Sequence, residues 1–108
     1  MIAFISGPYR SKNGRTVRYN VRQAEKYALK YWTLGYAVIC PHLNTAFFDG
    51  ELPDHRWLEG DLEFIDRLKQ EEQDIIVMIP GWEDSEGSCA ELRRAAAIGL
   101  NVIEEEEL

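Results

Sequence analysis

Two kinds of hydrophobic pattern alternate along the chain. Short runs are apolar at nearly every position and rich in β-branched residues, which is typical of strands buried on both faces of a sheet. They span residues 2–5, 37–39 and 75–79, and a weaker run spans residues 101–103. The pattern therefore predicts about four short strands.

Longer stretches between these runs carry an apolar residue at every third or fourth position, which is the spacing of a helix with one buried face. They cover residues 21–34, 58–68 and 92–96. Gly35 supplies a C-terminal stop for the first stretch, and Pro53 introduces the second. Three helices are therefore expected between the strands.

Strands that alternate with helices predict right-handed crossovers and a parallel sheet covered by helices on both faces. The fold class is thus α/β, a three-layer sandwich of the flavodoxin-like or Rossmann-like kind with strand order 2-1-3-4. Residues 1–108 form one domain, because so short a chain has too little apolar surface for two cores. Such sheets bind ligands beyond the carboxyl ends of the strands, which here lead into residues 6–19, 40–56 and 80–88.

Composition narrows the classes of partner. Hydrophobic residues make up 45% of the chain, as expected for a packed globule, and the formal net charge is −7. This charge argues against nucleic-acid polymers, whose binders usually carry excess Lys and Arg. The acidic residues 104–108 are expected to be a solvated tail. Small anionic ligands remain possible, because basic residues gather near the start of the chain: Arg10, Lys12, Arg15, Arg18 and Arg22.

The remaining composition indicates a cytoplasmic protein without cofactors. Cys40 and Cys89 stand far apart, outside any zinc-ligand spacing, so neither a metal site nor a disulfide is predicted. No apolar stretch approaches the roughly 20 residues that span a bilayer, and Met1 leads directly into a strand-like run without a secretory signal pattern. No membrane partner is therefore expected.

The loop after the first strand contains a turn glycine, Gly7, between Ser6 and Tyr9, and Arg10 follows where a phosphate or carboxylate could bind. An ordinary strand-to-helix turn with a surface arginine explains the same residues equally well. The loop after the second strand contains His42 and Asn44. Together with nearby aromatic residues they suit a base or sugar pocket, although a lone histidine is more often a hydrogen-bonded support.

The loop after the third strand leads into a helix whose free N–H groups favour an anion, and Ser85 adds a hydroxyl. The same helix dipole should help to keep Glu91 ionised, as a nucleophile requires. The alternative is structural. Ser88 and Glu91 have the S-x-x-E spacing of a capping box, in which the glutamate bonds back to a backbone N–H, and the residues alone favour this interpretation.

Asp61 supports a catalytic role for this region. It lies at helical spacing between Leu58 and Ile65, so the pattern that buries these residues also turns a carboxylate toward the core. Two carboxylates at one cleft are a usual arrangement for acid–base work on a glycosidic bond. In the structural alternative, Asp61 accepts a hydrogen bond from an arginine or from His42.

Four segments, residues 4–10, 40–42, 61–62 and 85–92, occur in a familiar order. They resemble the nucleoside 2-deoxyribosyltransferase superfamily, and in particular short members of phages and bacteria, whose nearest characterised relatives are the 2'-deoxynucleoside 5'-phosphate N-hydrolases. The resemblance covers nearly the whole chain, and its most specific element is the S-x-G-x-x-x-E pattern at its last segment.

The resemblance implies that Glu91 is the catalytic nucleophile and that Asp61 assists the departing base. Arg10 would lie near a 5'-phosphate. Two departures stand out. Phe4 occupies a position that usually carries a tyrosine, so Tyr9 would have to supply the missing hydroxyl. The hydrolases continue past the fourth strand into a segment that reaches a partner subunit's phosphate site, whereas this sequence stops at Leu108. The predicted substrate-binding residues are Ser6, Gly7, Tyr9, Arg10, His42, Asn44, Ser85, Gly87 and Ser88.

The sequence thus predicts cleavage or transfer at the N-glycosidic bond of a nucleoside or nucleoside 5'-monophosphate. The alternative is a non-catalytic module that senses or sequesters a nucleotide or a nucleotide-derived signal. By resemblance, and because a four-stranded sheet leaves apolar surface to cover, a homodimer or higher homo-oligomer is expected.

Overall fold

The computed structural model describes residues 1–10 and 16–107. Its centre is a parallel four-stranded sheet in the order β2-β1-β3-β4, which confirms the predicted fold class and strand order. β1 and β3 lie in the middle, with Ser6 opposite Met78 where both strands end. The strands are β1 (Ile2–Ser6), β2 (Ala37–Ile39), β3 (Ile75–Met78) and β4 (Asn101–Glu104).

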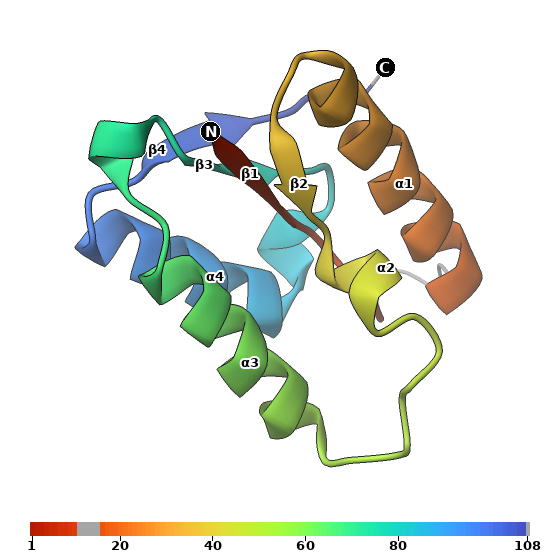
Figure 1. Cartoon of the computed structure of the whole chain (residues 1–108). Helices are drawn as coiled ribbons and strands as arrows, with labels where there is room; N and C mark the ends of the chain where they lie inside the picture. The colour runs from red at the N-terminus through yellow and green to blue at the C-terminus, as the bar shows by residue number, and fades with distance from the viewer. Residues whose placement is uncertain (11–15, 108) are drawn as a thin grey trace.

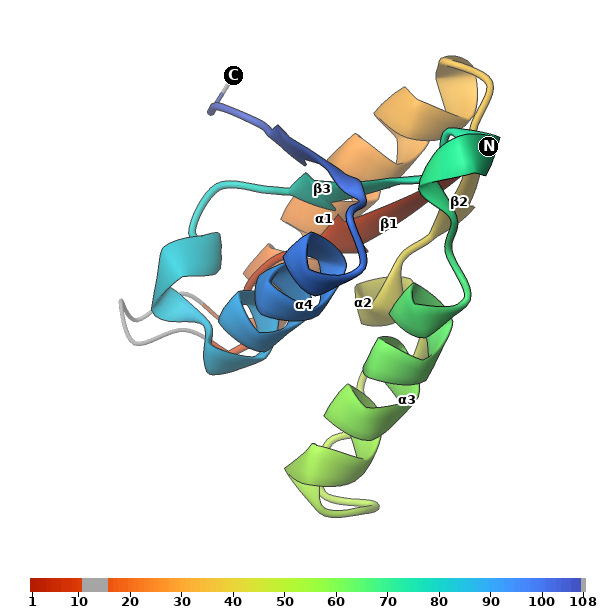
Figure 2. The same ribbon diagram turned by 90° about the vertical axis from the view of Figure 1, so that its left-hand side faces the viewer.

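Helices cover both faces of this sheet. Helix α1 lies on one side, and α3 and α4 lie on the other (Figures 1 and 2). The short α2 follows β2 directly, and it escaped the sequence analysis because a single turn is too short to show periodicity. Within the described ranges, no helix is long and apolar enough to cross a membrane. The helices are α1 (Val17–Thr33), α2 (Pro41–Asn44), α3 (Asp54–Asp66) and α4 (Glu86–Ala97), with 3₁₀ turns η1 (Gln70–Glu72) and η2 (Trp82–Asp84).

The alternation of side chains along β1 divides the core into two layers. Ala3 and Ile5 face the layer that contains buried residues of α1, whereas Phe4 faces the layer that contains buried residues of α3 and α4. Successive side chains of a strand point to opposite faces, so Ser6 falls on the same face as Phe4. The last residue of β1 therefore presents a buried hydroxyl toward α3 and α4.

The ends of α1 follow local rules. The Thr16 side chain caps its start by accepting a hydrogen bond from the Tyr19 N–H at 3.0 Å. At its end, Gly35 adopts a φ of 99°, a left-handed conformation that favours glycine. The predicted stop at Gly35 is thus confirmed.

The acidic C-terminal segment differs from the expectation. The Glu105 backbone N–H donates to the Met78 carbonyl at 2.9 Å, which extends the pairing of β4. The Glu105 carboxylate then accepts hydrogen bonds from Lys30 Nζ at 2.7 and 2.9 Å and from the Tyr31 hydroxyl at 2.6 Å. The prediction of a solvated tail is wrong for this residue, because α1 offers it a cation and a hydroxyl.

Candidate functional site

A cavity of about 620 Å³ opens beyond the carboxyl ends of the central strands. Its size lies in the range of small-molecule sites. All three loops that the sequence analysis selected contribute to its walls, and α3 and α4 supply the rest. The residues that line it include Ile5, Gly7, Tyr9, Arg10, His42, Asp49, Asp54, Trp57, Leu58, Asp61, Asp84, Ser85, Glu86, Gly87, Ser88 and Glu91.

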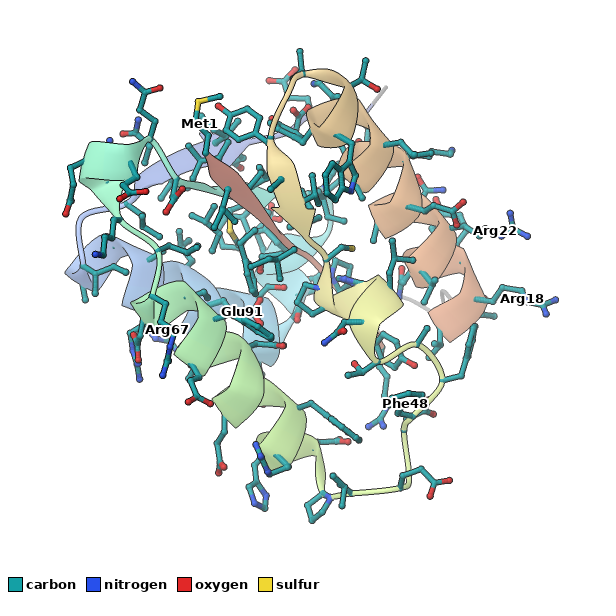
Figure 3. The ribbon with its side chains drawn as sticks, viewed as in Figure 1. Met1, Arg18, Arg22, Phe48, Arg67 and Glu91 are labelled. Carbon is teal, nitrogen blue, oxygen red and sulfur yellow. The ribbon has the colours of Figure 1, made fainter. Side chains whose placement is uncertain are left out.

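Two carboxyl groups meet in this cavity. Glu91 lies on the side of α4 that faces α3 and is only 6% exposed (Figure 3). Its carboxyl group is hydrogen-bonded to that of Asp61 on α3, and it also accepts a 2.6 Å hydrogen bond from the Ser6 hydroxyl. The structure therefore brings together three predicted residues that are far apart in sequence.

Helical spacing explains why the two carboxyl groups point inward. Asp61 precedes Ile65 by four residues, and Glu91 precedes Ala95 by four. Both Ile65 and Ala95 are fully buried in the core beneath α3 and α4. Since residues four apart share a helix face, packing of the two helices carries both acids toward the same place.

Burial and mutual repulsion set the protonation of this pair. Burial raises the pKa of Asp61 to about 6, although its hydrogen bond to Glu91 acts in the opposite direction. Burial, followed by the charge of Asp61, raises the pKa of Glu91 well above its ordinary value. The pair therefore retains a proton at a pH where two free carboxyl groups would both be ionised. The expectation that the helix dipole keeps Glu91 ionised is wrong, because desolvation outweighs the dipole.

The start of α4 settles the capping alternative. The helix begins at Glu86, and the Ser85 hydroxyl caps it by accepting the Ser88 N–H at 3.1 Å. Glu91 lies in the second turn and bonds to side chains rather than to a backbone N–H. The capping-box interpretation of Ser88 and Glu91 is therefore wrong, because Ser85 takes the cap three residues earlier.

His42 and Ser88 place unpartnered polar atoms at the cavity. His42 Nε2 lies 2.9 Å from the Pro8 carbonyl, which only accepts, so Nε2 carries the hydrogen and Nδ1 is an acceptor. Burial lowers the pKa of His42, and the ring is neutral. Nδ1 of His42 and Oγ of Ser88 are buried without a hydrogen-bond partner among the described residues. Buried polar atoms are normally paired, so both are available to a group that binds beside them.

The polar residues at the cavity mouth have other partners. Arg10 forms a two-bond ion pair with Asp54, at 2.6 and 3.1 Å. The Tyr9 hydroxyl donates to Asp49 at 3.0 Å and accepts from the Phe47 N–H at 2.8 Å. Tyr9 thus anchors the loop after α2 and does not bond to the carboxyl pair.

The remaining predicted residues divide between the wall and the surface. Gly7 and Gly87 line the cavity, and a Cβ atom at Gly7 would overlap the side chain of Ile79, so the close approach of two loops requires glycine there. Asn44 is exposed at the end of α2 and lies outside the cavity wall. Phe4 is fully buried and has no hydroxyl. The hydroxyl group that donates to Glu91 is that of Ser6, two residues further along β1.

Sequence analysis missed the acidic residues of the wall. Asp49, Asp54, Asp84 and Glu86 all line the cavity, and each lies within or beside a loop that was selected. The excess of acidic residues in those loops is the feature of the sequence that could have indicated them. Among the described residues, no three His, Cys, Asp or Glu side chains are arranged to hold a metal ion, and both cysteines are free.

Comparison with known proteins gives one match to a family. The sequence model of a family described as "Domain of unknown function (DUF4406)" matches residues 1–104. Among curated proteins, no match was found.

Proposed function

We propose that this chain, which belongs to the DUF4406 family, cleaves the N-glycosidic bond of a nucleoside or nucleoside 5'-monophosphate and passes the sugar to water or to a second base. One observation carries the proposal. Two hydrogen-bonded carboxyl groups, Asp61 and Glu91, are withdrawn from water at a ligand-sized cavity without a cation bonded to either among the described residues. Such an arrangement lowers the stability of the fold. Buried acids with strongly shifted pKa values are typical of catalytic sites.

The pair holds one proton that either partner can carry. A proton on Glu91 prevents attack by that group. Its transfer to Asp61 prepares both groups at once, because Glu91 becomes a carboxylate nucleophile and Asp61 becomes an acid. The hydrogen bond from Ser6 favours the ionised form of Glu91 and assists this transfer.

The reaction then proceeds in two displacements. Glu91 Oε attacks the anomeric carbon as the bond to the base nitrogen breaks, and the base takes the proton of Asp61. A glycosyl ester of Glu91 results. Water or a second base next attacks the same carbon, its proton passes to Asp61, and the ester oxygen departs with its electron pair. The carboxyl pair ends with one proton, as it began.

The contact between the carboxyl groups supports a covalent route. An enzyme that adds water directly holds its two carboxyl groups about 6.5–9.5 Å apart, whereas the covalent route uses groups about 5–5.5 Å apart. Two groups in contact reach the second distance with the smaller separation when the sugar enters. Asp61 and Glu91 are hydrogen-bonded to each other. Trp57 and Leu58 of α3 supply apolar walls beside them, which suit a planar base and exclude water.

The test is incubation of the protein with a panel of ribo- and deoxyribonucleosides and their 5'-monophosphates, with and without an acceptor base. Base release is followed by chromatography. We expect release by the wild type and a loss of about 10³-fold or more in Glu91→Gln, which removes the nucleophile but keeps the shape. Glu105→Gln is the matched control and should retain full turnover, since Glu105 lies on α1's side of the sheet.

Binding without catalysis is a second candidate, and one observation favours it. Phe4 has no hydroxyl, and the Tyr9 hydroxyl is engaged by Asp49 and Phe47. The same panel separates the two functions. Thermal stabilisation by one nucleotide, with no base released over hours, would establish the binding module and reject the glycosidase.

A further inference from the structure

The charged residues that line the cavity are mostly acidic. Arg10 is the single Lys or Arg among the described lining residues. A phosphate dianion is usually held by such cations or by a free helix N-terminus. The six acidic lining residues are Asp49, Asp54, Asp61, Asp84, Glu86 and Glu91.

The basic residues near the start of the chain do not offset this charge within the described ranges. The Arg10 guanidinium group donates two hydrogen bonds to Asp54 and is therefore already paired. Arg18 and Arg22 project from the outer side of α1, away from Glu91 (Figure 3). A dianion that enters the cavity would therefore meet carboxylates without a free cation from these three residues.

The start of α4 offers an anion only the N–H groups of Glu86 and Gly87, because the next two are taken. The Ser85 hydroxyl occupies the Ser88 N–H, and the Cys89 N–H bonds to the Ser85 carbonyl. Asp84 and Glu86 flank these groups at the cavity wall. Their negative charge opposes the partial positive charge of the helix end.

The unpartnered atoms of His42 and Ser88 favour a hydroxyl group of the ligand over a phosphate. Nδ1 of neutral His42 accepts a hydrogen bond, and a phosphate dianion carries no proton to donate. A sugar hydroxyl can donate to His42 and can accept from the Ser88 hydroxyl. Both side chains line the cavity and are at least nine-tenths buried, at 5% and 2% exposure.

We propose that the substrate is an unphosphorylated nucleoside, with Asp84 and Glu86 as the residues that exclude a 5'-phosphate. The inference rests on the proposed function and narrows its substrate class. His42 and Ser88 hold a sugar hydroxyl beside the carboxyl pair, and the two acids at the start of α4 make the corresponding 5'-monophosphate a poor substrate.

The experiment compares kcat/KM for a nucleoside and its own 5'-monophosphate. We expect the wild type to prefer the nucleoside by at least about tenfold, because like charges oppose binding of the dianion. The double variant D84N/E86Q should reduce this preference by raising kcat/KM for the monophosphate. Glu83→Gln is the matched control, since Glu83 is exposed, adjacent and outside the cavity wall, and it should leave the preference unchanged.

Other outcomes separate this inference from the proposed function. A higher kcat/KM for the monophosphate would overturn the inference while the glycosidic chemistry stands. Lys12 and Arg15 lie outside the described residues, so K12Q/R15Q would then show whether they bind the phosphate. If neither compound is cleaved, the proposed function fails, and the melting temperature of the protein decides the inference: stabilisation by the nucleoside alone supports it, and equal or greater stabilisation by the monophosphate overturns it.

Discussion

Two glutamates, the partly buried Glu105 and the buried Glu91, lie on opposite faces of the sheet in contrasting surroundings. Glu105 is next to Lys30 and Tyr31. Burial alone would raise its pKa, but their hydrogen bonds and the charge of Lys30 together lower it. Glu91 is next to Asp61 and Ser6, and burial together with the second acid raises its pKa. For Glu105 a cation and a hydroxyl compensate the loss of water, whereas no cation does so for Glu91 among the described residues.

The difference separates a structural acid from a candidate catalytic one. Burial of an acid is expected to stabilise a fold only when a cation or donors replace the lost water. Glu105 meets that condition and fixes the C-terminal segment to α1. Glu91 fails it, yet helical packing holds the side chain in place. A function for Glu91 and Asp61 explains why such an arrangement is retained.

After loss of the nucleophile, the largest expected effect comes from Asp61→Asn. An asparagine keeps the shape but cannot deliver a proton to the departing base, so kcat should fall by about 10²- to 10⁴-fold. The loss should be smallest for substrates whose base leaves easily without protonation. Steady-state rates for bases of graded leaving ability test this, and an equal loss for all of them would contradict the assigned role.

Stability should change in the opposite direction at the same site. Glu91→Gln removes a buried acid whose pKa is raised, and with it the cost of that raised pKa, so the free energy of unfolding at pH 7 should rise by about 1–3 kcal/mol. Because the folded pKa values are raised, the folded wild type binds more protons than the unfolded chain. Its stability should therefore fall as the pH rises from about 4 through about 6 and beyond.

Urea unfolding at several pH values measures this effect. The stability difference between Glu91→Gln and the wild type should grow with pH. A variant that is less stable than the wild type at pH 7 to 8 would mean that the carboxyl pair contributes to the fold, which would remove the contrast with Glu105.

Ser6→Ala should have an intermediate effect. Loss of the 2.6 Å hydrogen bond raises the pKa of Glu91 further, so the ionised nucleophile becomes harder to reach. We expect kcat to fall about tenfold, the equivalent of roughly 1.4 kcal/mol, with the rising limb of the pH–rate profile moved to higher pH. Loss of rate without movement of that limb would limit Ser6 to packing.

Glu105→Gln should have the smallest effect. It removes the ion pair with Lys30 and should cost about 1 kcal/mol at neutral pH, with turnover unchanged. Since the folded pKa is lowered, the contribution is present above the unfolded pKa and disappears as the pH falls through the folded value. Urea midpoints at pH 7 and at pH 3 check this, and an equal loss at both would contradict the ion-pair explanation.

The sequence predicted what short-range patterns determine. Continuous apolar runs indicated the strands, and the spacing of Asp61 to Ile65 indicated that its carboxyl group turns inward, which the structure confirms. Contacts between distant segments were beyond reach. Arg10 bonds to Asp54, 44 residues away, and nothing local to either residue indicates the pairing.

Protonation and capping escaped prediction for related reasons. The helix dipole indicated an ionised Glu91, but the pKa depends on burial and on a neighbour from another helix. Both Ser85 and Ser88 are residue types that cap helices. Ser85 is the cap because η2 ends at Asp84 and α4 begins directly after Ser85.

The measurement that tests the central claim most directly is mass spectrometry of the protein quenched during turnover of a cleaved nucleoside, followed by peptide mapping. The account predicts a glycosyl adduct on the peptide that contains Glu91, formed in the wild type and absent in Glu91→Gln. Base release that persists in Glu91→Gln, with no adduct on that peptide of the wild type, would show that Glu91 is not the nucleophile.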